Sequence, residues 1–217
     1  MSFINSIFDF LTHPSGILYI AAYIVGGIPF GYILARIFAG VDIKQAGSSS
    51  VGATNVLRVV RQKDERLAKR LALATVLFDA LKGAVMVLLA KALGFPVAAQ
   101  WLVGILVVLG HCYSPFLGFE GGKGVATGMG VLMVLLPIET LIGIAVWAIV
   151  AKTTKISSLA SLSGLAAVVV SSFIIHPELP EVKSHAPLLI LAFIIFYKHI
   201  PNIYRLVTGQ EKKVVEG

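Results

Sequence analysis

Residues 71–93 read LALATVLFDALKGAVMVLLAKAL, a mostly apolar run that exceeds the roughly 20 residues a helix needs to cross the hydrocarbon of a bilayer. Similar runs fill the chain. Its 217 residues are 57% hydrophobic and 13% charged, with a mean hydropathy of +0.90. Water-soluble globular domains do not have this composition. The sequence therefore predicts an all-α, polytopic membrane helix bundle that forms a single domain over residues 1–217, with a short polar tail from about residue 207.

About seven transmembrane helices are expected, with boundaries uncertain by a few residues. The apolar runs are Gly16–Ala39, Leu71–Leu93, Val97–Leu109, Val125–Leu136, Ile138–Ala151, Leu159–Ile175 and Pro187–Ile200. The fourth and fifth runs could instead form one long helix. Pro137 followed by Glu139 favours a tight turn between two short helices, because proline disrupts a helix interior.

The distribution of Lys and Arg supports an odd number of spans. Basic residues alternate between rich and poor connections, as the positive-inside rule requires. The basic segments hold Lys44, Arg58, Arg61, Lys63, Arg66, Lys69, Arg70, Lys123, Lys152, Lys155, Lys198, Arg205, Lys212 and Lys213. This pattern predicts an amino terminus outside and a carboxyl terminus in the cytoplasm. Because the basic residues lie in short segments between apolar runs, no nucleic-acid partner is expected.

A first polar loop spans residues 46–58 and reads AGSSSVGATNVLR. Small hydroxyl residues and glycines lead into an expected helix that carries Arg58. The unpaired backbone amides at the start of such a helix suit an anion. Taken alone, the loop could equally be a solvated connection with a capping Ser or Thr.

A second polar loop spans residues 110–127 and reads GHCYSPFLGFEGGKGVAT. Glycines around Lys123 can turn backbone N–H groups toward a phosphate while the ammonium group supplies charge. A Walker A loop is excluded, because that motif needs glycine at the position of Leu117 and Ser or Thr at the position of Gly124. His111 and Cys112 point apart on a helix, so we expect them to pack rather than to act as a nucleophilic pair. The loop predicts a phosphate site.

Two further polar groups lie at the ends of expected spans on the same side. Ser158 and Ser161 are three residues apart on one helical face, although serine in membrane helices is often only packing. His199, Asn202 and Arg205 recur every three residues and could also anchor the helix at the interface. All four signals meet on one face of the membrane, so together they predict an active site at the cytoplasmic face.

Asp79 and Lys82 lie within the expected second span, three residues apart. An ion pair inside a membrane is costly, so it should face the bundle interior. We interpret it as a structural clamp, with a proton relay as the alternative.

These motifs together resemble those of the bacterial acyl-phosphate:glycerol-3-phosphate acyltransferases (PlsY). The similarity covers roughly residues 27–209 and includes Ser48, residues 52–55, Arg58, residues 110–111 and 121–127, residues 158–161, His199 and residues 202–206. One motif departs from the family, which usually has Gly-Ser-Gly-Asn where this chain has residues 47–50, GSSS. Ser49 there lacks glycine's freedom at positive φ, so no role is carried over to it, and the role of Ser50 stays open.

The resemblance implies transfer of a fatty acyl group from acyl phosphate to the sn-1 hydroxyl of glycerol 3-phosphate, in phospholipid biosynthesis. The implied catalytic residues are Ser48, Arg58, Lys123, Ser161, His199 and Asn202, and the implied substrate-binding residues are Gly52, Thr54, Asn55, Gly121, Gly122, Gly124, Thr127 and Ser158. The base could be His199 or the departing phosphate itself. No acyl-enzyme, cofactor or metal is expected.

The remaining expectations concern location and assembly. We expect a multi-pass protein of the bacterial inner membrane, in contact with membrane lipids and monomeric. The alternative is a membrane transporter of a phosphorylated solute. Transporters place binding groups near the bilayer midplane between repeated halves, whereas the polar motifs here lie at span ends without an internal repeat.

Overall fold

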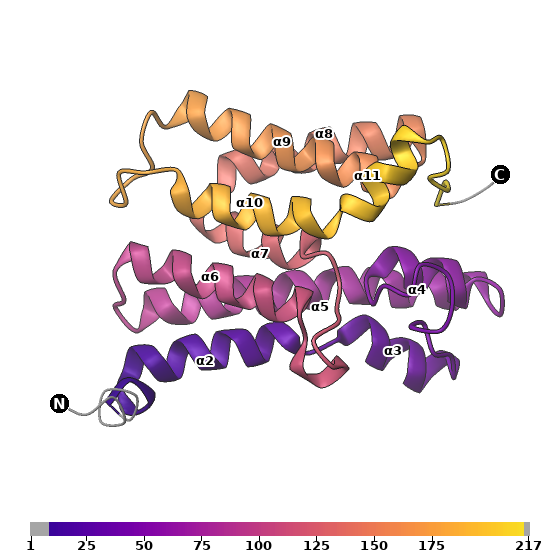
Figure 1. Ribbon diagram of the computed structural model, residues 1–217, viewed down its shortest axis with the longest axis horizontal. Coiled ribbons are helices and arrows are strands. Elements are labelled where there is room, and N and C mark those ends of the chain that lie inside the picture. Colours follow the sequence, from indigo (N-terminus) through magenta and orange to yellow (C-terminus); the bar gives the residue numbers. More distant parts are fainter. Residues whose placement is uncertain (1–8, 215–217) are drawn as a thin grey trace.

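The computed structural model describes residues 9–214 as a bundle of helices that run nearly side by side (Figure 1). The helices are α2 (Pro14–Gly27), α3 (Phe30–Ala39), α4 (Ala53–Val60), α5 (Glu65–Ala92), α6 (Val97–Cys112), the 3-10 turn η1 (Pro115–Leu117), α7 (Val125–Leu135), α8 (Pro137–Thr154), α9 (Ser157–Ile175), α10 (Ala186–Lys198) and α11 (Ile200–Val207). The predicted all-α membrane bundle is therefore confirmed. Helix α2 begins at one end of the bundle and α11 ends at the other.

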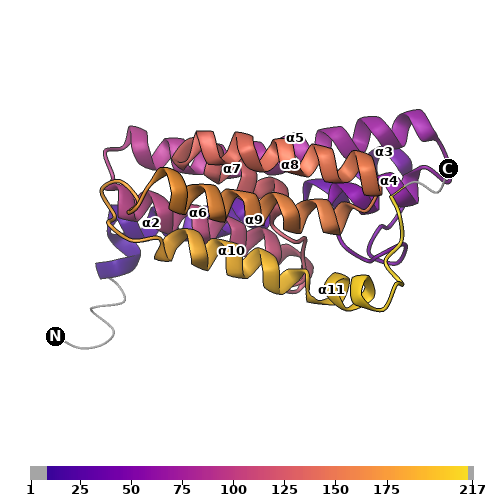
Figure 2. The same ribbon diagram turned by 90° about the horizontal axis from the view of Figure 1, so that it is seen from above.

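The helices differ in whether they can cross a bilayer on their own. Within residues 9–214, four segments have the length and hydropathy of a span: 14–39, α5, α8 and α9. Helices α10 and α11 form a fifth candidate, a pair bent by 58° at His199 that Figure 2 shows from above. Helices α6 and α7 are apolar but shorter. The exact count of seven stays a prediction.

The first expected span is broken, although its apolar run predicted one continuous helix. Helix α2 ends at Gly27 and α3 begins at Phe30, with Ile28 and Pro29 between them. Proline has no backbone N–H, so the regular hydrogen-bond ladder cannot continue through it. The carbonyl of Ile28 accepts hydrogen bonds from the backbone N–H of Phe30 at 3.1 Å and from Lys82 Nζ on α5 at 2.9 Å. Inside a membrane such a break is tolerated only where protein groups satisfy the backbone.

The break expected between the fourth and fifth apolar runs is confirmed at Leu136. Helix α7 ends at Leu135 and α8 begins at Pro137, where a proline at the first helical position leaves no unsatisfied N–H. Helix α8 extends to Thr154 and stops at Lys155, whose φ of 60° is left-handed. The fourth and fifth runs are therefore two helices rather than one.

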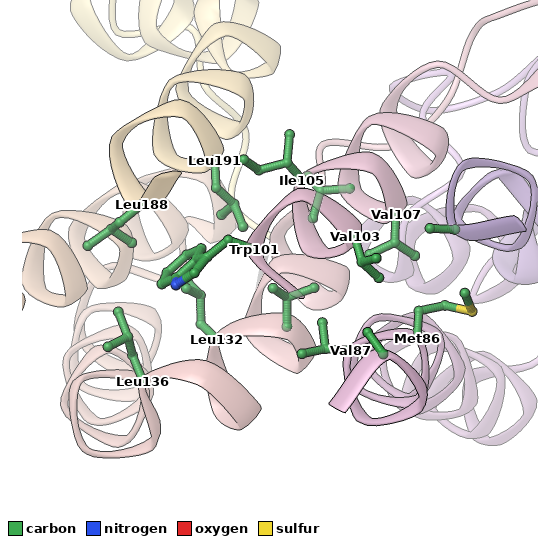
Figure 3. Packing of buried hydrophobic residues seen from close by; sticks show 14 of the residues in the cluster. Met86, Val87, Trp101, Val103, Ile105, Val107, Leu132, Leu136, Leu188 and Leu191 are labelled. Atoms are coloured by element: carbon green, nitrogen blue, oxygen red, sulfur yellow. The ribbon is translucent and has the colours of Figure 1, made fainter. Parts of the chain in front are cut away.

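Helix α6 forms the centre of the main hydrophobic core (Figure 3). Trp101, Val103 and Val107 of α6 are buried in the same cluster as Val87 of α5 and Leu191 of α10. Helices α2 and α6 also approach closely, since a Cβ added to Gly26 would lie 2.1 Å from the carbonyl oxygen of Val107. Close helix contacts through small residues are typical of membrane bundles.

Large apolar side chains cover the outside of the bundle. On α5, Leu73, Leu77, Leu81 and Val85 follow one another at intervals of four residues and are each more than half exposed. Such a surface would be unstable in water, and it suits contact with lipid tails. These exposed rows agree with the multi-pass membrane architecture.

Candidate active site

A cavity of about 960 Å³ lies between α4, α7, α8, α9, α10 and the chain that follows α11. Eleven of the fourteen residues expected at a site line it: Ser48, Gly52, Thr54, Asn55, Arg58, Lys123, Gly124, Ser158, Ser161, His199 and Asn202. Helices far apart in sequence contribute to it. The cavity has a polar end, formed by these residues, and an apolar end, formed by side chains of α5, α7, α8 and α9.

Asn55 organises the first polar loop from within. Its side-chain amide donates to the carbonyl oxygens of Ile43, Ala46 and Ser50, at 2.8, 3.1 and 2.9 Å, and its Oδ1 accepts from the backbone N–H of Ser48 at 2.8 Å. All its hydrogen-bonding capacity faces the chain. Although Asn55 borders the cavity, its contacts make it a residue that shapes the loop.

The departure from the family motif at residues 47–50 can now be located. Ser49 has a φ of 56°, so this position does require the left-handed conformation that glycine adopts most easily. Ser49 does not line the cavity, whereas Ser50 does. The serine at position 49 is therefore a local backbone substitution outside the cavity wall.

Three expected substrate-binding residues, Gly121, Gly122 and Thr127, do not line the cavity. The N–H of Gly122 donates to the carbonyl oxygen of His111 at 3.0 Å, so it is not available for a phosphate. A Cβ on Gly121 or Gly122 would collide with His111, at 2.2 Å from its backbone oxygen and 2.0 Å from its ring Nε2. Thr127 is fully buried against α5. All three residues are closely packed in this structure, and their role in binding stays a prediction.

Lys123 lies at the start of α7 and reaches the polar end of the cavity. Burial lowers the pKa of Lys123 to about 8; nearby Arg205 and Arg58 act in the same direction, while Glu211 opposes them. A desolvated ammonium group that faces other cations is poorly neutralised, so the site favours a doubly charged anion.

Glu211, which no sequence motif indicated, lies among the expected site residues. Its carboxylate accepts hydrogen bonds from Ser158 Oγ at 2.7 Å, Asn202 Nδ2 at 2.6 Å and Arg205 Nε at 2.6 Å. Burial acts to raise the pKa of Glu211, but these three bonds outweigh it and hold the pKa below its usual value. The segment expected to be a simple polar tail thus closes one side of the cavity. The backbone of Val214 also bonds to Lys155 at 2.8 Å.

His199 has a fixed orientation at the junction of α10 and α11. Its Nδ1 lies 2.8 Å from the carbonyl oxygen of Ile195, which can only accept, so Nδ1 carries the proton. The other ring nitrogen, Nε2, is then a hydrogen-bond acceptor. His199 is almost fully buried and borders the cavity, so it can accept a proton or a hydrogen bond from a bound hydroxyl.

Asp79 and Lys82 face the interior, as expected, and meet a third residue there. Lys82 Nζ lies 2.8 Å from Asp79 Oδ1 and 3.0 Å from His111 Nδ1, and all three side chains are at least nine-tenths buried. This group ties α5 to α6. Asp79 and His111 also border the cavity.

The apolar end of the cavity is deep. Val168 is 11 residues beyond Ser157, at the start of α9, and so lies roughly 17 Å along the helix from it. The wall there is formed by Val76, Leu132, Ile144, Trp147, Leu165 and Val168, with Gly143 and Gly164 between them. Within residues 9–214, no group of three His, Cys, Asp or Glu side chains is arranged to hold a metal ion.

The fold and cavity define an integral membrane protein that can hold a molecule with an anionic head and a long hydrocarbon tail. The chain belongs to the glycerol-3-phosphate acyltransferase family, whose model matches residues 16–209. A relative in a Nitratiruptor species is 76% identical over 95% of this chain and 99% of its own length. One in Wolinella succinogenes is 56% identical over 95% and 100%. Both are glycerol-3-phosphate acyltransferases, so this protein is an acyltransferase of phospholipid biosynthesis.

Two solved structures share the fold. One is PlsY (YgiH), an integral membrane glycerol 3-phosphate acyltransferase in its glycerol 3-phosphate form; it is 35% identical, with a TM-score of 0.83 over 93% of this chain and 96% of that one. The other is the same enzyme in its lysophosphatidic acid form, with a TM-score of 0.81. At this identity the similarity includes sequence as well as fold.

Proposed function

We propose that the protein transfers a fatty acyl group from acyl phosphate to the sn-1 hydroxyl of glycerol 3-phosphate, giving lysophosphatidic acid and inorganic phosphate. The observation that carries this proposal is the two-ended cavity. Its polar end gathers Lys123, Arg58 and Arg205, enough cationic groups for two phosphates, while its apolar end suits an acyl chain. The relatives' names and the two forms of the solved PlsY enzyme support the acceptor and the product.

The reaction needs two phosphate groups to be held close together. We assign Lys123 and Arg58 to phosphate charge, with the Gly124 amide, Gly52 and the Thr54 hydroxyl beside the acyl phosphate. Charge-assisted contacts of this kind stabilise the negative charge that develops on the leaving phosphate. Thr54 Oγ1 already lies 2.9 Å from Ser157 Oγ, which fixes its direction.

We assign a second set of cavity residues to the acceptor. Ser48, Ser161, His199 and Asn202 are in position to orient the hydroxyls of glycerol 3-phosphate. Ser158 acts through Glu211, to which it is bonded. An acyl phosphate is already activated, so positioning and charge neutralisation suffice and the departing phosphate can take the proton. No acyl-enzyme intermediate is needed.

The distribution of Lys and Arg indicates on which side of the membrane the polar end of the cavity lies. The end of the bundle that holds the cavity's polar groups also holds most basic residues outside the spans, which the positive-inside rule places in the cytoplasm of the bacterial inner membrane. A reporter fused after Gly217 should therefore be cytoplasmic and one fused before Met1 periplasmic. A periplasmic signal from the first fusion would reject this orientation. We further expect a monomer.

A donor assay tests the proposed function. The purified protein in detergent receives labelled glycerol 3-phosphate with acyl phosphate, acyl-CoA or acyl carrier protein in separate reactions. Lysophosphatidic acid should form only with acyl phosphate. Equal or faster product formation from acyl-CoA or acyl carrier protein would overturn the donor assignment. Movement of glycerol 3-phosphate across a vesicle membrane without acylation would favour the transporter.

A further inference from the structure

We propose that His111 is a further catalytic residue, which donates a hydrogen bond from its ring Nε2–H to the carbonyl oxygen of the bound acyl donor. This role rests on the proposed function, because it deepens the chemistry of the same cavity. Three observations carry it: the tautomer of the ring, the position of Nε2, and the place of His111 between the two ends of the cavity.

The tautomer follows from the partners of Lys82. Its Nζ lies 2.9 Å from the carbonyl oxygen of Ile28, 2.8 Å from Asp79 Oδ1 and 3.0 Å from His111 Nδ1. We take Lys82, paired with Asp79 at 2.8 Å, as an ammonium group, which has three donors and no acceptor. His111 Nδ1 must therefore accept. A neutral ring whose Nδ1 accepts carries its proton on Nε2.

The Nε2–H group of His111 has no protein partner among residues 9–214. Nε2 is not among the fully buried polar atoms that lack a partner, so it keeps some exposed surface. His111 as a whole is only 6% exposed. His111 borders the cavity, and we infer that its remaining exposed surface faces the cavity. A donor fixed in direction and left without a protein acceptor is suited to a ligand acceptor.

The position of His111 indicates which atom of the bound acyl donor it contacts. The ring edge with Nε2 contacts Gly122, the residue before Lys123, which we assign to phosphate. On the other side, Asp79 borders the cavity one helical turn from Val76, which belongs to the apolar wall. In an acyl phosphate, the group between the phosphate and the hydrocarbon is the carbonyl.

The hydrogen bond would strengthen as the reaction proceeds. The sn-1 oxygen of glycerol 3-phosphate forms a bond to the acyl carbon, and the π pair of the carbonyl moves onto its oxygen. When the C=O bond re-forms, the bond from the acyl carbon to the phosphate oxygen breaks and its electron pair leaves with phosphate, which takes the hydroxyl proton. His111 Nε2–H stabilises the oxyanion without transferring a proton. Lys82 and Asp79 hold the ring as positioning residues.

Substitution of His111 separates this role from packing. His111→Phe fills the same space without a donor and should lower kcat about 100-fold, the usual effect of losing one oxyanion donor, with the KM for glycerol 3-phosphate within about threefold of wild type. His111→Gln retains an N–H donor and should recover part of the rate. His185→Phe is the matched control, because His185 is equally buried at 7% exposed but does not border the cavity. It should retain wild-type kcat.

The tautomer of His111 can be determined without measuring enzyme activity. In protein with ¹⁵N-labelled histidine, assigned by comparison with the single variants, the ring of His111 should be protonated on Nε2 and that of His199 on Nδ1 at neutral pH. An Nδ1–H tautomer at His111 would overturn the proposal, as would wild-type kcat in His111→Phe protein that unfolds at a normal temperature. A wild-type protein inactive with acyl phosphate would reject the proposed function, and this role with it. An active wild type with an active His111→Phe would reject only this role.

Discussion

The two ends of the cavity are built in different ways. At the polar end, side chains are fixed by hydrogen bonds to other parts of the chain: Asn55 holds the loop of Ser48, Ile195 holds His199, and Glu211 holds Asn202. At the apolar end, shape alone is defined, where Gly143 and Gly164 let α8 and α9 approach. The polar end is preorganised for charge, and the apolar end is a space whose size can be changed.

This difference leads to different expected effects of mutation. Removing one directed contact at the polar end should lower the rate by orders of magnitude, because such contacts act on the transition state. Changing volume at the apolar end should alter which acyl chain is used, by smaller factors. The expected effects are therefore largest at the phosphate contacts and smallest along the acyl chain.

Lys123→Met should have the largest effect. It removes a charge-assisted contact to phosphate, which contributes on the order of 2–4 kcal/mol in the transition state, so kcat/KM should fall about 30- to 1000-fold. Steady-state kinetics with acyl phosphate measure this. Lys69→Met, at an exposed lysine on α5, is the control and should be fully active. Wild-type rates in stable Lys123→Met protein would reject the phosphate assignment.

His199→Ala should lose most activity, whereas His199→Asn discriminates between two roles. If His199 only positions glycerol 3-phosphate, the amide should retain a hydrogen bond, so kcat should recover to within about tenfold while the KM for glycerol 3-phosphate rises. This is the outcome we expect. An inactive His199→Asn with unchanged KM would instead make His199 the general base.

Glu211→Gln should raise the KM for glycerol 3-phosphate about tenfold and lower the thermal unfolding temperature. The amide keeps one accepting oxygen, which can still bond Ser158 and Asn202, but it replaces the oxygen that accepts from Arg205 by a donor. The remaining bonds also lose the negative charge that strengthens them. Glu120→Gln, at an exposed carboxylate paired with Lys44, is the comparison variant. Equal KM values for the two variants would show that Glu211 does not order the polar end.

The pH dependence of kcat/KM should report the protonation state of Lys123. Because its pKa is lowered to about 8, the ammonium form dominates below that pH and is lost above it. The value of kcat/KM, which reports groups that titrate in the free enzyme, should therefore fall about tenfold between pH 7 and pH 9. Lys123→Arg keeps its charge over this range and should lose this decline. A decline that persists unchanged in Lys123→Arg would assign it to another group.

Val168→Phe should have the smallest effect on overall rate and the clearest effect on selectivity. The larger side chain shortens the apolar end, so the longest acyl phosphates should lose about tenfold in kcat/KM relative to short ones. Val168→Ala should shift the preference in the opposite direction. An unchanged chain-length profile in both variants would place the acyl chain elsewhere.

The sequence predicted elements whose signal is local. Hydropathy predicted a bundle of apolar helices, and Pro137 marked the break between α7 and α8. Pro29 gave the same kind of signal, but the apolar run around it masked the break, which the distant Lys82 stabilises. Helix α5 begins at Glu65, before the apolar run, because Asp64 caps it and its first turns lie beyond the hydrocarbon-length segment.

Lys123 and His199 were expected at a site from their motifs, and both border the cavity, while their chemical roles stay predictions. The position of Gly121 and Gly122 outside the cavity wall could not be predicted, because a glycine that admits a phosphate and one that admits a histidine ring look alike in sequence. Only the position of His111 distinguishes them. Glu211 was missed because its partners Ser158 and Asn202 are 53 and 9 residues away, so nothing near it indicates a binding role.

The central claim is that one cavity holds both substrates, so that the glycerol 3-phosphate hydroxyl attacks the acyl phosphate directly. Rapid-quench measurements with acyl phosphate at enzyme concentrations comparable to substrate test it. We expect inorganic phosphate and lysophosphatidic acid to appear at the same rate and in equal amounts, with no phosphate released when glycerol 3-phosphate is omitted. A burst of phosphate equal to the enzyme concentration without the acceptor would show an acyl-enzyme and contradict the account.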